Sequence, residues 1–376
     1  MDFDFTWLLL GLPLAFVLGW LASRFDLRQL RIDNKRSPKA YFKGLNHLLN
    51  EQQDAAIDAF IEAVQKDPDT SELHFALGNL FRRRGEYDRA VRVHEHLMAR
   101  GDLSKADHQR AQHALALDYL KAGLLDRAED ALGKLEGTKF EAEARLARLA
   151  IFERTRDWPA AQQVAQQLQA SGQGDFSTRL AHYLCEQADG APPEQQSALL
   201  QQAMAIAPQA ARPLMALAAL QEAAGDANSA LNTLLAGIVS APSAIPLVAN
   251  QLVQLSLKCE RIEPVQTALQ AFYTQTRSLD ALQALNQFQA LLTGSTTDNH
   301  LLLAHLKTDP SLVVTAQLMK TTSATPPDIQ RALDKAAQPL LRYRCAACGF
   351  EASRHFWHCP GCQSWDSYST RRVEEL

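Results

Sequence analysis

The sequence predicts an all-α protein: a solenoid of helical repeats, preceded by a transmembrane helix and followed by a small metal-binding ribbon. Three observations predict this fold class. Small, apolar and turn-forming residues recur every 34 residues, an uncharged apolar stretch lies near the N-terminus, and two Cys-x-x-Cys pairs lie near the C-terminus. We therefore expect five segments: an anchor at 1–23, a basic juxtamembrane segment at 24–38, the repeat array at 39–320, a linker and helix at 321–341, and the ribbon at 342–376.

The first segment has the length and composition of a membrane span. No charged residue occurs from Phe5 to Ser23, and about 19 helical residues reach about 28 Å, enough to cross a bilayer core. A cleaved signal peptide is the alternative, but its first residues should be basic, whereas Asp2 and Asp4 occur here. Basic residues follow instead, from Arg24 to Lys43. Because positive charge stays in the cytoplasm, we expect an uncleaved single-pass anchor with its N-terminus outside and the remaining chain cytoplasmic.

The central segment carries the spacing of the tetratricopeptide repeat. Gly44 and Gly78 are 34 residues apart, as are Pro208 and Pro242 later in the chain. Small residues at fixed offsets allow two antiparallel helices to touch, and Gly or Pro ends each pair. The pattern is degraded after residue 140 and fades again after Pro242. About six repeats are recognisable, and further helical pairs are expected up to about residue 320.

Such an array presents the first helix of each repeat on one face, which can bind a peptide or protein. On the second and third repeats this face is expected to present Glu72, Phe75, Asn79, Arg82, Arg83, Arg110, His113, Leu117 and Lys121. The alternative, a solvated helix face, is the more frequent role for any single residue. The same holds for the charge run Arg82–Arg84. The isolated Cys185 and Cys259 are expected to be buried apolar side chains.

The C-terminal segment carries the most specific motif. Its four cysteines are Cys345, Cys348, Cys359 and Cys362. Their C-x2-C-x10-C-x2-C spacing makes two tight turns that direct four thiolates at one point, as in structural zinc sites. One zinc ion is predicted, and iron is the alternative because similar turns hold iron in rubredoxins. His355 and His358 could replace a ligand, but four cysteines suffice. The five aromatic residues expected to cover the site are Phe350, Phe356, Trp357, Trp365 and Tyr368.

The ribbon is too short to bury a sufficient core by itself. The metal would supply the missing stability, about 10–16 kcal/mol by analogy with zinc-dependent peptides. A helix is expected to begin near Thr325–Asp328 and cannot pass Pro339, because proline lacks the donor N–H. Few residues then remain before Cys345, so the ribbon should dock against the array.

Composition argues against two other classes of function. A net charge of −4 over 376 residues leaves no basic footprint for nucleic acid. The ribbon's arginines are offset by acidic residues: Arg342, Arg344, Arg354, Arg371 and Arg372 against Glu351, Asp366, Glu374 and Glu375. No phosphate-binding loop, nucleophile elbow or HExxH motif occurs. We expect a protein that is not an enzyme; a membrane-tethered zinc-ribbon nucleic-acid-binding protein is the alternative, and a thiol-disulfide oxidoreductase is a third reading.

These segments together are similar to those of one known family. An acidic start before an apolar span, an array that begins near Tyr41–Asn46, and the terminal cysteine ribbon resemble the lipopolysaccharide assembly protein B family of Gram-negative bacteria. The resemblance implies a rubredoxin-like ribbon that binds one metal ion through the four cysteines.

The resemblance also implies a function and partners. Members are inner-membrane adaptors that regulate lipopolysaccharide synthesis, helping a membrane-bound AAA+ metalloprotease degrade the deacetylase that commits precursors to lipid A. The implied partners are this protease, the deacetylase, an inner-membrane lipopolysaccharide sensor and other lipopolysaccharide assembly proteins. Self-association into a homo-oligomer is left open.

Overall fold

A computed structural model of the chain describes residues 15–20, 42–294, 299–321 and 325–376. The chain divides into two compact units, Met1–Thr155 and Arg156–Leu376. The division falls in the stretch where the repeat pattern is degraded. The described residues are helical apart from turns and two short strands in the ribbon, which confirms the predicted all-α array.

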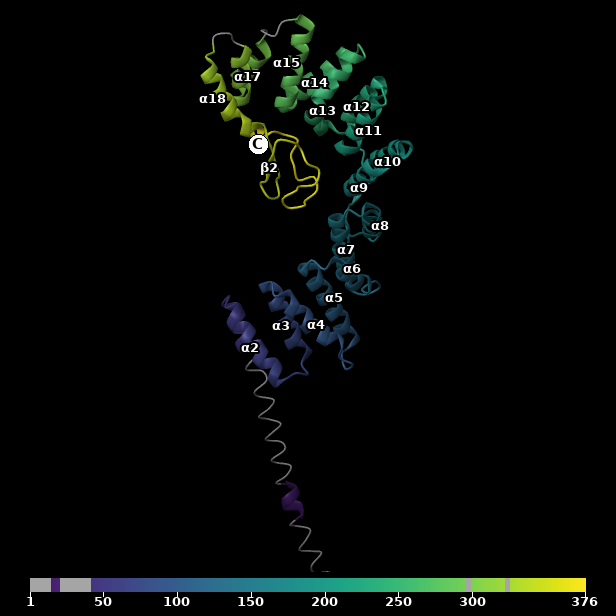
Figure 1. Cartoon of the computed structure of the whole chain (residues 1–376), viewed down its shortest axis with the longest axis vertical. Helices are drawn as coiled ribbons and strands as arrows, with labels where there is room; N and C mark the ends of the chain where they lie inside the picture. Colours follow the sequence, from purple (N-terminus) through teal and green to yellow (C-terminus); the bar gives the residue numbers. More distant parts are fainter. Residues whose placement is uncertain (1–14, 21–41, 295–298, 322–324) are drawn as a thin grey trace, which may run out of the picture. The chain divides into compact units, whose positions relative to one another are not determined.

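Unit 1 is a stack of antiparallel helices. After helical residues 15–20 and 42–49, its helices are α2 Gln53–Lys66, α3 Ser71–Arg84, α4 Tyr87–Met98, α5 Lys105–Ala122, α6 Leu125–Gly133 and α7 Glu141–Thr155 (Figure 1). Helices α3 and α5 end at Gly85 and Gly123, whose φ angles of 85° and 78° lie in the left-handed region. Glycine adopts this conformation without a Cβ clash. The left-handed turns therefore explain why glycine follows each of these two helices.

The apolar positions of the repeat pattern form the core of unit 1. The buried members are Ala56, Phe60, Ala63, Phe81, Ala90, Leu97, Tyr119, Ala128 and Leu132. Small alanines let neighbouring helices approach closely, and the larger side chains fill the space between them. The structure therefore confirms the offsets predicted from the repeat.

A buried polar network joins α3, α4 and α5. The Arg82 guanidinium donates to an oxygen of Asp118 at 2.9 Å, and the other oxygen of Asp118 is bonded to Nδ1 of His94. The side chains of Asp118 and His94 are fully buried. Gly78 leaves room for the imidazole, because a Cβ at this position would lie 2.5 Å from the ring. Arg82 is therefore not part of a solvated helix end, contrary to the interpretation of the Arg82–Arg84 run.

Replacing Gly78 by alanine should displace His94 from Asp118. We expect the free energy of unfolding of unit 1 to fall by about 1–3 kcal/mol, the usual effect of overpacking a core, measured by urea unfolding. Gly133→Ala is the matched control, since Gly133 is helical and a Cβ there meets no atom within 4 Å. Equal stability of the two variants would contradict the packing role of Gly78.

Unit 2 is itself a stack of antiparallel helices and ends in the ribbon. Its helices are α8 Trp158–Ala170, α9 Ser177–Gly190, α10 Pro193–Ile206, α11 Ala211–Ala223, α12 Ala227–Ser240, η1 Pro242–Ala244, α13 Ile245–Lys258, α14 Ile262–Thr276, α15 Leu279–Thr293, α16 His300–Thr308, α17 Leu312–Thr321 and α18 Pro327–Ala337, followed by η2 Gln338–Leu341. The ribbon contains β1 Tyr343–Arg344, β2 Glu351–Ala352 and η3 Val373–Glu375. Strands β1 and β2 are antiparallel, with Tyr343 opposite Ala352.

The connection to the ribbon is as short as predicted. Helix α18 begins at Pro327 and ends at Ala337, two residues before Pro339. The single turn η2 then leads directly into β1. The ribbon, yellow in Figure 1, consequently lies against the helices of unit 2.

None of the described helices is long and apolar enough to cross a membrane. The predicted anchor at 1–23 lies outside the described residues except for the helical residues 15–20. The basic segment at 24–38 lies outside them entirely.

Candidate metal centre and its docking surface

The ribbon brings four cysteine thiols together. This thiol site consists of Cys345, Cys348, Cys359 and Cys362, whose sulfur atoms all lie within 4.8 Å of one another. The Sγ atoms of Cys345 and Cys362 are 3.8 Å apart, and those of Cys348 and Cys359 are 3.7 Å apart. A tetrahedral ion with metal–sulfur bonds of about 2.3 Å requires sulfur atoms about 3.8 Å apart. The donor atoms and their spacing fit a four-coordinate metal that has no open position.

Backbone and hydroxyl groups shape the electrostatics of these thiols. Burial alone would raise the pKa of Cys345, but the Ser367 hydroxyl and the backbone amides of Cys348 and Ala347 lower it to about 6. Although the Phe350 amide opposes it, partial desolvation and the three neighbouring thiols raise the pKa of Cys348 to about 12. Four sulfur atoms this close do not all ionise unless a cation balances their charge.

The thiol site is buried on one side only. Cys345 and Cys359 are buried, whereas Cys348 and Cys362 are exposed. Tyr343, Tyr368, Phe356 and, from α13, Leu247 pack over the buried thiols. Of the aromatic residues expected to cover the site, Phe350 instead is 44% exposed, and the two tryptophans contact the array.

The two histidines between the cysteine pairs have other contacts. His355 Nε2 lies 3.3 Å from the backbone oxygen of Tyr368, and His358 Nε2 lies 2.8 Å from that of Gln363. Within the described part of the chain, the group of side chains placed to hold a metal consists of the four cysteines. The histidines therefore have packing roles.

Trp365 carries the first contact between ribbon and array. Its indole stacks on His182 of α9 with ring centroids 4.9 Å apart, and meets the Tyr183 ring edge-on at 5.9 Å. His182 Nε2 is also bonded to a carboxylate oxygen of Asp366 at 2.8 Å. His182 is buried although it is polar. Trp365 covers its ring, and the Asp366 carboxylate provides a hydrogen-bond partner for its imidazole.

Arg372 carries the second contact, near the C-terminus. Its guanidinium donates to both oxygens of Asp280 in α15, at 2.9 and 2.7 Å, and to the backbone oxygen of Leu341 at 2.8 Å. The same group lies 4.1 Å from the centre of the Tyr343 ring. Although burial opposes it, the Asp280 carboxylate raises the pKa of Arg372, and the bidentate geometry makes this a strong, orientation-specific pair.

The carboxylates of Glu374 and Glu375 carry the third contact. Glu374 accepts hydrogen bonds from the Ser311 hydroxyl at 2.7 Å and from the Leu312 amide at 2.6 Å, at the start of α17. Glu375 accepts from the Leu279 amide, the first residue of α15, at 2.9 Å. Burial raises the pKa of Glu375 despite these donors. Negative charge at a helix N-terminus satisfies orphan amides and interacts favourably with the helix dipole, typically by about 1 kcal/mol per cap.

These docking residues were not recognised from the sequence. In the sequence, Arg372, Glu374 and Glu375 are recognisable only as charged residues of the ribbon whose opposite signs balance. Their partners lie more than 60 residues earlier in the chain, and no local pattern pairs an acidic tail with a distant helix start. The expectation that the ribbon docks against the array is confirmed.

The structure confirms only in part which residues this face exposes. Phe75 is wrong, since it is 1% exposed and lies beneath the Arg110 guanidinium. Arg110 is paired with Glu72. A cleft of about 450 Å³ does lie between residues 42–49 and α3, lined by Leu45, Leu48, Phe60, Ala76, Asn79, Leu80, Arg82 and Arg83.

The isolated cysteines are apolar core residues to different degrees. Cys185 is buried, and burial raises the pKa of its thiol to about 12, which makes it unreactive. Cys259 is only partly buried, against the main core of unit 2.

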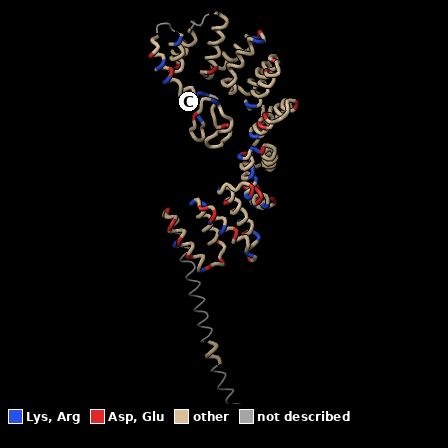
Figure 2. Tube along the Cα trace, viewed as in Figure 1, with Lys and Arg blue, Asp and Glu red and all other residues tan. Residues whose placement is uncertain are grey.

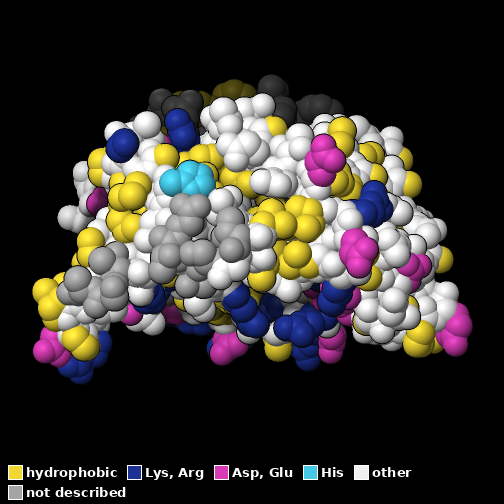
Figure 3. Space-filling model, turned by 90° about the horizontal axis from the view of Figure 1, so that it is seen from above, with side chains coloured by type: hydrophobic (Ala, Val, Ile, Leu, Met, Phe, Trp, Pro, Cys, Tyr) yellow, Lys and Arg dark blue, Asp and Glu magenta, His cyan; other side chains and the backbone are white. Residues whose placement is uncertain are grey.

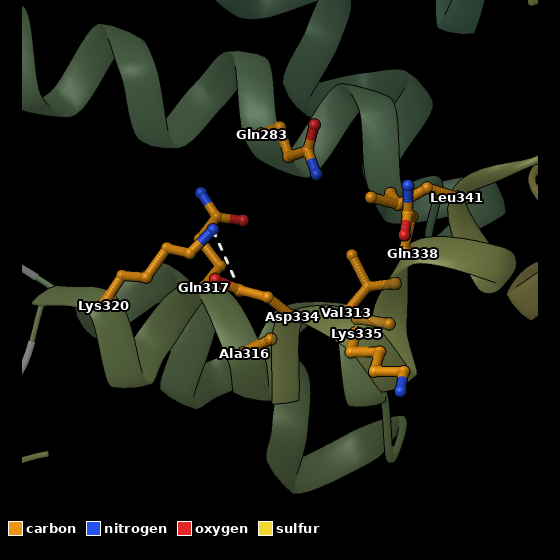
Figure 4. Close-up of a pocket in the computed structure, with 10 residues that line it drawn as sticks. Gln283, Val313, Ala316, Gln317, Lys320, Asp334, Lys335, Gln338 and Leu341 are labelled. Atoms are coloured by element: carbon orange, nitrogen blue, oxygen red, sulfur yellow. Dashed lines mark ion pairs between the residues drawn. The ribbon is translucent and has the colours of Figure 1, made fainter. Parts of the chain in front are cut away.

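A second cleft, of about 540 Å³, lies apart from the thiol site, between α15, α17 and α18. Gln283 of α15, Gln317 of α17 and Gln338 of η2, the turn after α18, approach it (Figure 4). Its one carboxylate, Asp334, is paired with Lys320 at 3.0 Å.

Charged residues of both signs are mixed along the described part of the chain. Lys and Arg are interspersed with Asp and Glu in unit 1 (Figure 2), and the end of unit 2 that holds α15 and α17 shows apolar groups between mostly uncharged polar atoms (Figure 3). Leu291 and Leu292 of α15 and Leu303 of α16 are exposed. This distribution does not favour nucleic-acid binding, which needs a basic stripe.

The fold and the site define a class of protein: a tetratricopeptide-like helical array that carries a docked, four-cysteine metal-binding ribbon. The sequence model of the rubredoxin metal binding domain matches residues 343–368. Lipopolysaccharide assembly protein B of Escherichia coli strain K12 is 30% identical over 392 aligned positions, which cover 96% of each chain. The protein of that name from Haemophilus influenzae is 26% identical, again over 96% of each chain. The chain belongs to the lipopolysaccharide assembly protein B family.

Solved structures align with parts of the helical array. A tetratricopeptide repeat protein from Parabacteroides merdae matches 66% of this chain and 97% of its own, at 12% identity and a TM-score of 0.35. The Naa15/Naa10 complex bound to HypK-THB matches 81% of this chain and 46% of its own, at 16% identity and a TM-score of 0.43.

Replacing Cys345 or Cys359 by serine should remove about one equivalent of metal per chain, because either change leaves three thiolates for a four-coordinate ion. Elemental analysis of protein purified under reducing conditions measures this directly. Cys259→Ser is the matched control and should retain its metal, since Cys259 lies on the array. Wild-type protein without bound zinc or iron would refute the metal site.

Replacing Arg372 by alanine should leave the largely buried Asp280 carboxylate unpaired. We expect the docked ribbon to lose about 2–4 kcal/mol of stability, measured by urea unfolding followed through tryptophan fluorescence. Arg371→Ala is the control: Arg371 is exposed, and its loss should change stability by less than about 0.5 kcal/mol. Similar midpoints for both variants would argue against the role assigned to Arg372.

Proposed function

We propose that the protein is an inner-membrane adaptor that regulates lipopolysaccharide synthesis. It delivers the deacetylase that commits precursors to lipid A to a membrane-bound AAA+ protease, and an inner-membrane lipopolysaccharide sensor opposes it. The observation that carries this proposal is the match to lipopolysaccharide assembly protein B over 96% of the chain. The role as adaptor, rather than enzyme, is supported by the coordinatively closed thiol site and the paired carboxylate of the second cleft.

In this proposal the thiol site is structural. Cys345, Cys348, Cys359 and Cys362 hold one zinc ion, with iron as the alternative. Four-sulfur coordination leaves no position for substrate. Its contribution is to fold the ribbon, whose residues then pack on α9, α13, α15 and α17.

The client-binding surface is proposed to be the cleft between residues 42–49 and α3. Leu45, Leu48 and Leu80 supply apolar walls. Arg83 at its rim is exposed, whereas Arg82 is engaged with Asp118. An apolar peptide segment that carries an acidic side chain would match these apolar walls and the exposed Arg83 guanidinium.

The anchor at 1–23 confines the protein to the membrane that holds the protease. Confinement of two proteins to one surface raises the local concentration of each for the other without any new contact. This explains why a binding array and a transmembrane segment occur in one chain, with the bulk of the chain in the cytoplasm.

Deleting residues 1–23 tests the delivery mechanism. At native expression the shortened protein should still bind the deacetylase, but the deacetylase should persist in pulse-chase measurements and lipopolysaccharide should rise. An unrelated transmembrane helix of the same orientation should restore turnover if the anchor is only a tether. Normal turnover with the shortened protein, at matched level, would refute membrane delivery.

Reversing the charge at the cleft tests the client surface. Arg83→Glu should weaken capture of the purified deacetylase by about tenfold, as expected when an interfacial charge meets a like charge. Lys105→Glu is the control, since Lys105 is exposed and begins α5, where an acidic residue is tolerated. Equal capture by both variants would place the client elsewhere on the chain.

A further inference from the structure

The C-terminal tail Arg372–Leu376 connects the thiol site to the last helices of the array. We propose that this tail is a latch: occupancy of the thiol site by metal keeps it closed, and loss of metal releases the N-terminal turns of α15 and α17. The order of this end of the array then depends on the metal state of the ribbon.

The thiol site, whose metal occupancy controls the latch, is partly exposed to solvent. Cys348 and Cys362 are exposed, whereas Cys345 and Cys359 are buried. Gly361 and Phe350, which flank the exposed thiols, are exposed as well. A competing metal ligand in solution can therefore reach two of the four sulfur atoms while the ribbon remains docked.

The ribbon transmits the metal state to the tail through short contacts. The Ser367 hydroxyl lies 3.2 Å from Cys345 Sγ, and the Ser367 backbone oxygen accepts from the Ala346 amide at 2.6 Å. Farther along, the Val373 amide donates to the backbone oxygen of Arg342 at 2.8 Å. The segment from Ser367 to Val373, which leads into the tail, is thus held on both sides of the first cysteine turn, and unfolding of that turn loosens both attachments.

The tail acts on the first turns of two helices, α15 and α17. The amides of Leu279 in α15 and Leu312 in α17 donate to Glu375 and Glu374, and Asp280 is paired with Arg372. Departure of the tail removes these acceptors and leaves Asp280 without its guanidinium. Neither Glu374 nor Glu375 contacts a thiol, so their effect on α15 and α17 can be separated from metal binding.

Hydrogen exchange of the full-length protein, followed by mass spectrometry, tests the latch. Removing the metal with a chelator under reducing conditions should speed exchange at least about tenfold in the first turns of α15 and α17. Exchange in α10 and α12, which the tail does not contact, should be unchanged. Persistent protection of α15 and α17, or equal loss across all helices of unit 2, would overturn the proposal.

The double variant Glu374→Ala, Glu375→Ala, which removes both acceptors, distinguishes a latch from general unfolding of the ribbon. It should retain one equivalent of metal, yet show the faster exchange in α15 and α17 with metal bound. Arg371→Ala, one residue before the tail, is the control and should match the wild type in both measurements. If the double variant keeps wild-type protection, the carboxylates of Glu374 and Glu375 do not hold these helices.

Discussion

The convergence of four thiols is the constraint on which the C-terminal half of this protein depends. The ribbon has two strands of two residues each and a small buried cluster, too little apolar area to fold alone. A metal ion held by the four cysteines would supply that stability. Once folded, the ribbon presents Trp365, Arg372 and two glutamates to the array, so a site of four sulfur atoms also determines how several helices are packed and capped.

The contacts between ribbon and array differ in physical character. Trp365 and its aromatic neighbours contribute buried area and ring geometry. Arg372 contributes a bidentate, partly buried ion pair, whereas Glu374 and Glu375 act on backbone amides of α17 and α15. Polar contacts of this kind contribute orientation more than net stability, because desolvation offsets much of their attraction. The apolar contact therefore favours docking, and the polar contacts select one docked arrangement.

In unit 1, too, apolar side chains provide the packing and buried polar groups fix how the helices are arranged. Its alanines and leucines fill the spaces between helices, while the Arg82–Asp118–His94 network links three helices in one register. The network also engages the guanidinium of Arg82, whereas the neighbouring Arg83 stays exposed at the cleft. A buried structural network thereby determines which of two neighbouring arginines is exposed.

The sequence by itself determined the local features of this protein. The 34-residue repeat predicted the helical pairs, their glycine turns and their buried alanines, and the cysteine spacing predicted that four thiols converge, because these features depend on residues close together in the chain. Tertiary structure alone decided that Phe75 is buried beneath Arg110, that Arg82 pairs with Asp118 across two helices, and that Glu374 and Glu375 cap α17 and α15. Each of these contacts joins residues more than 30 positions apart, and an ion pair or helix cap at that separation follows from how helices pack, which no local pattern of residues encodes.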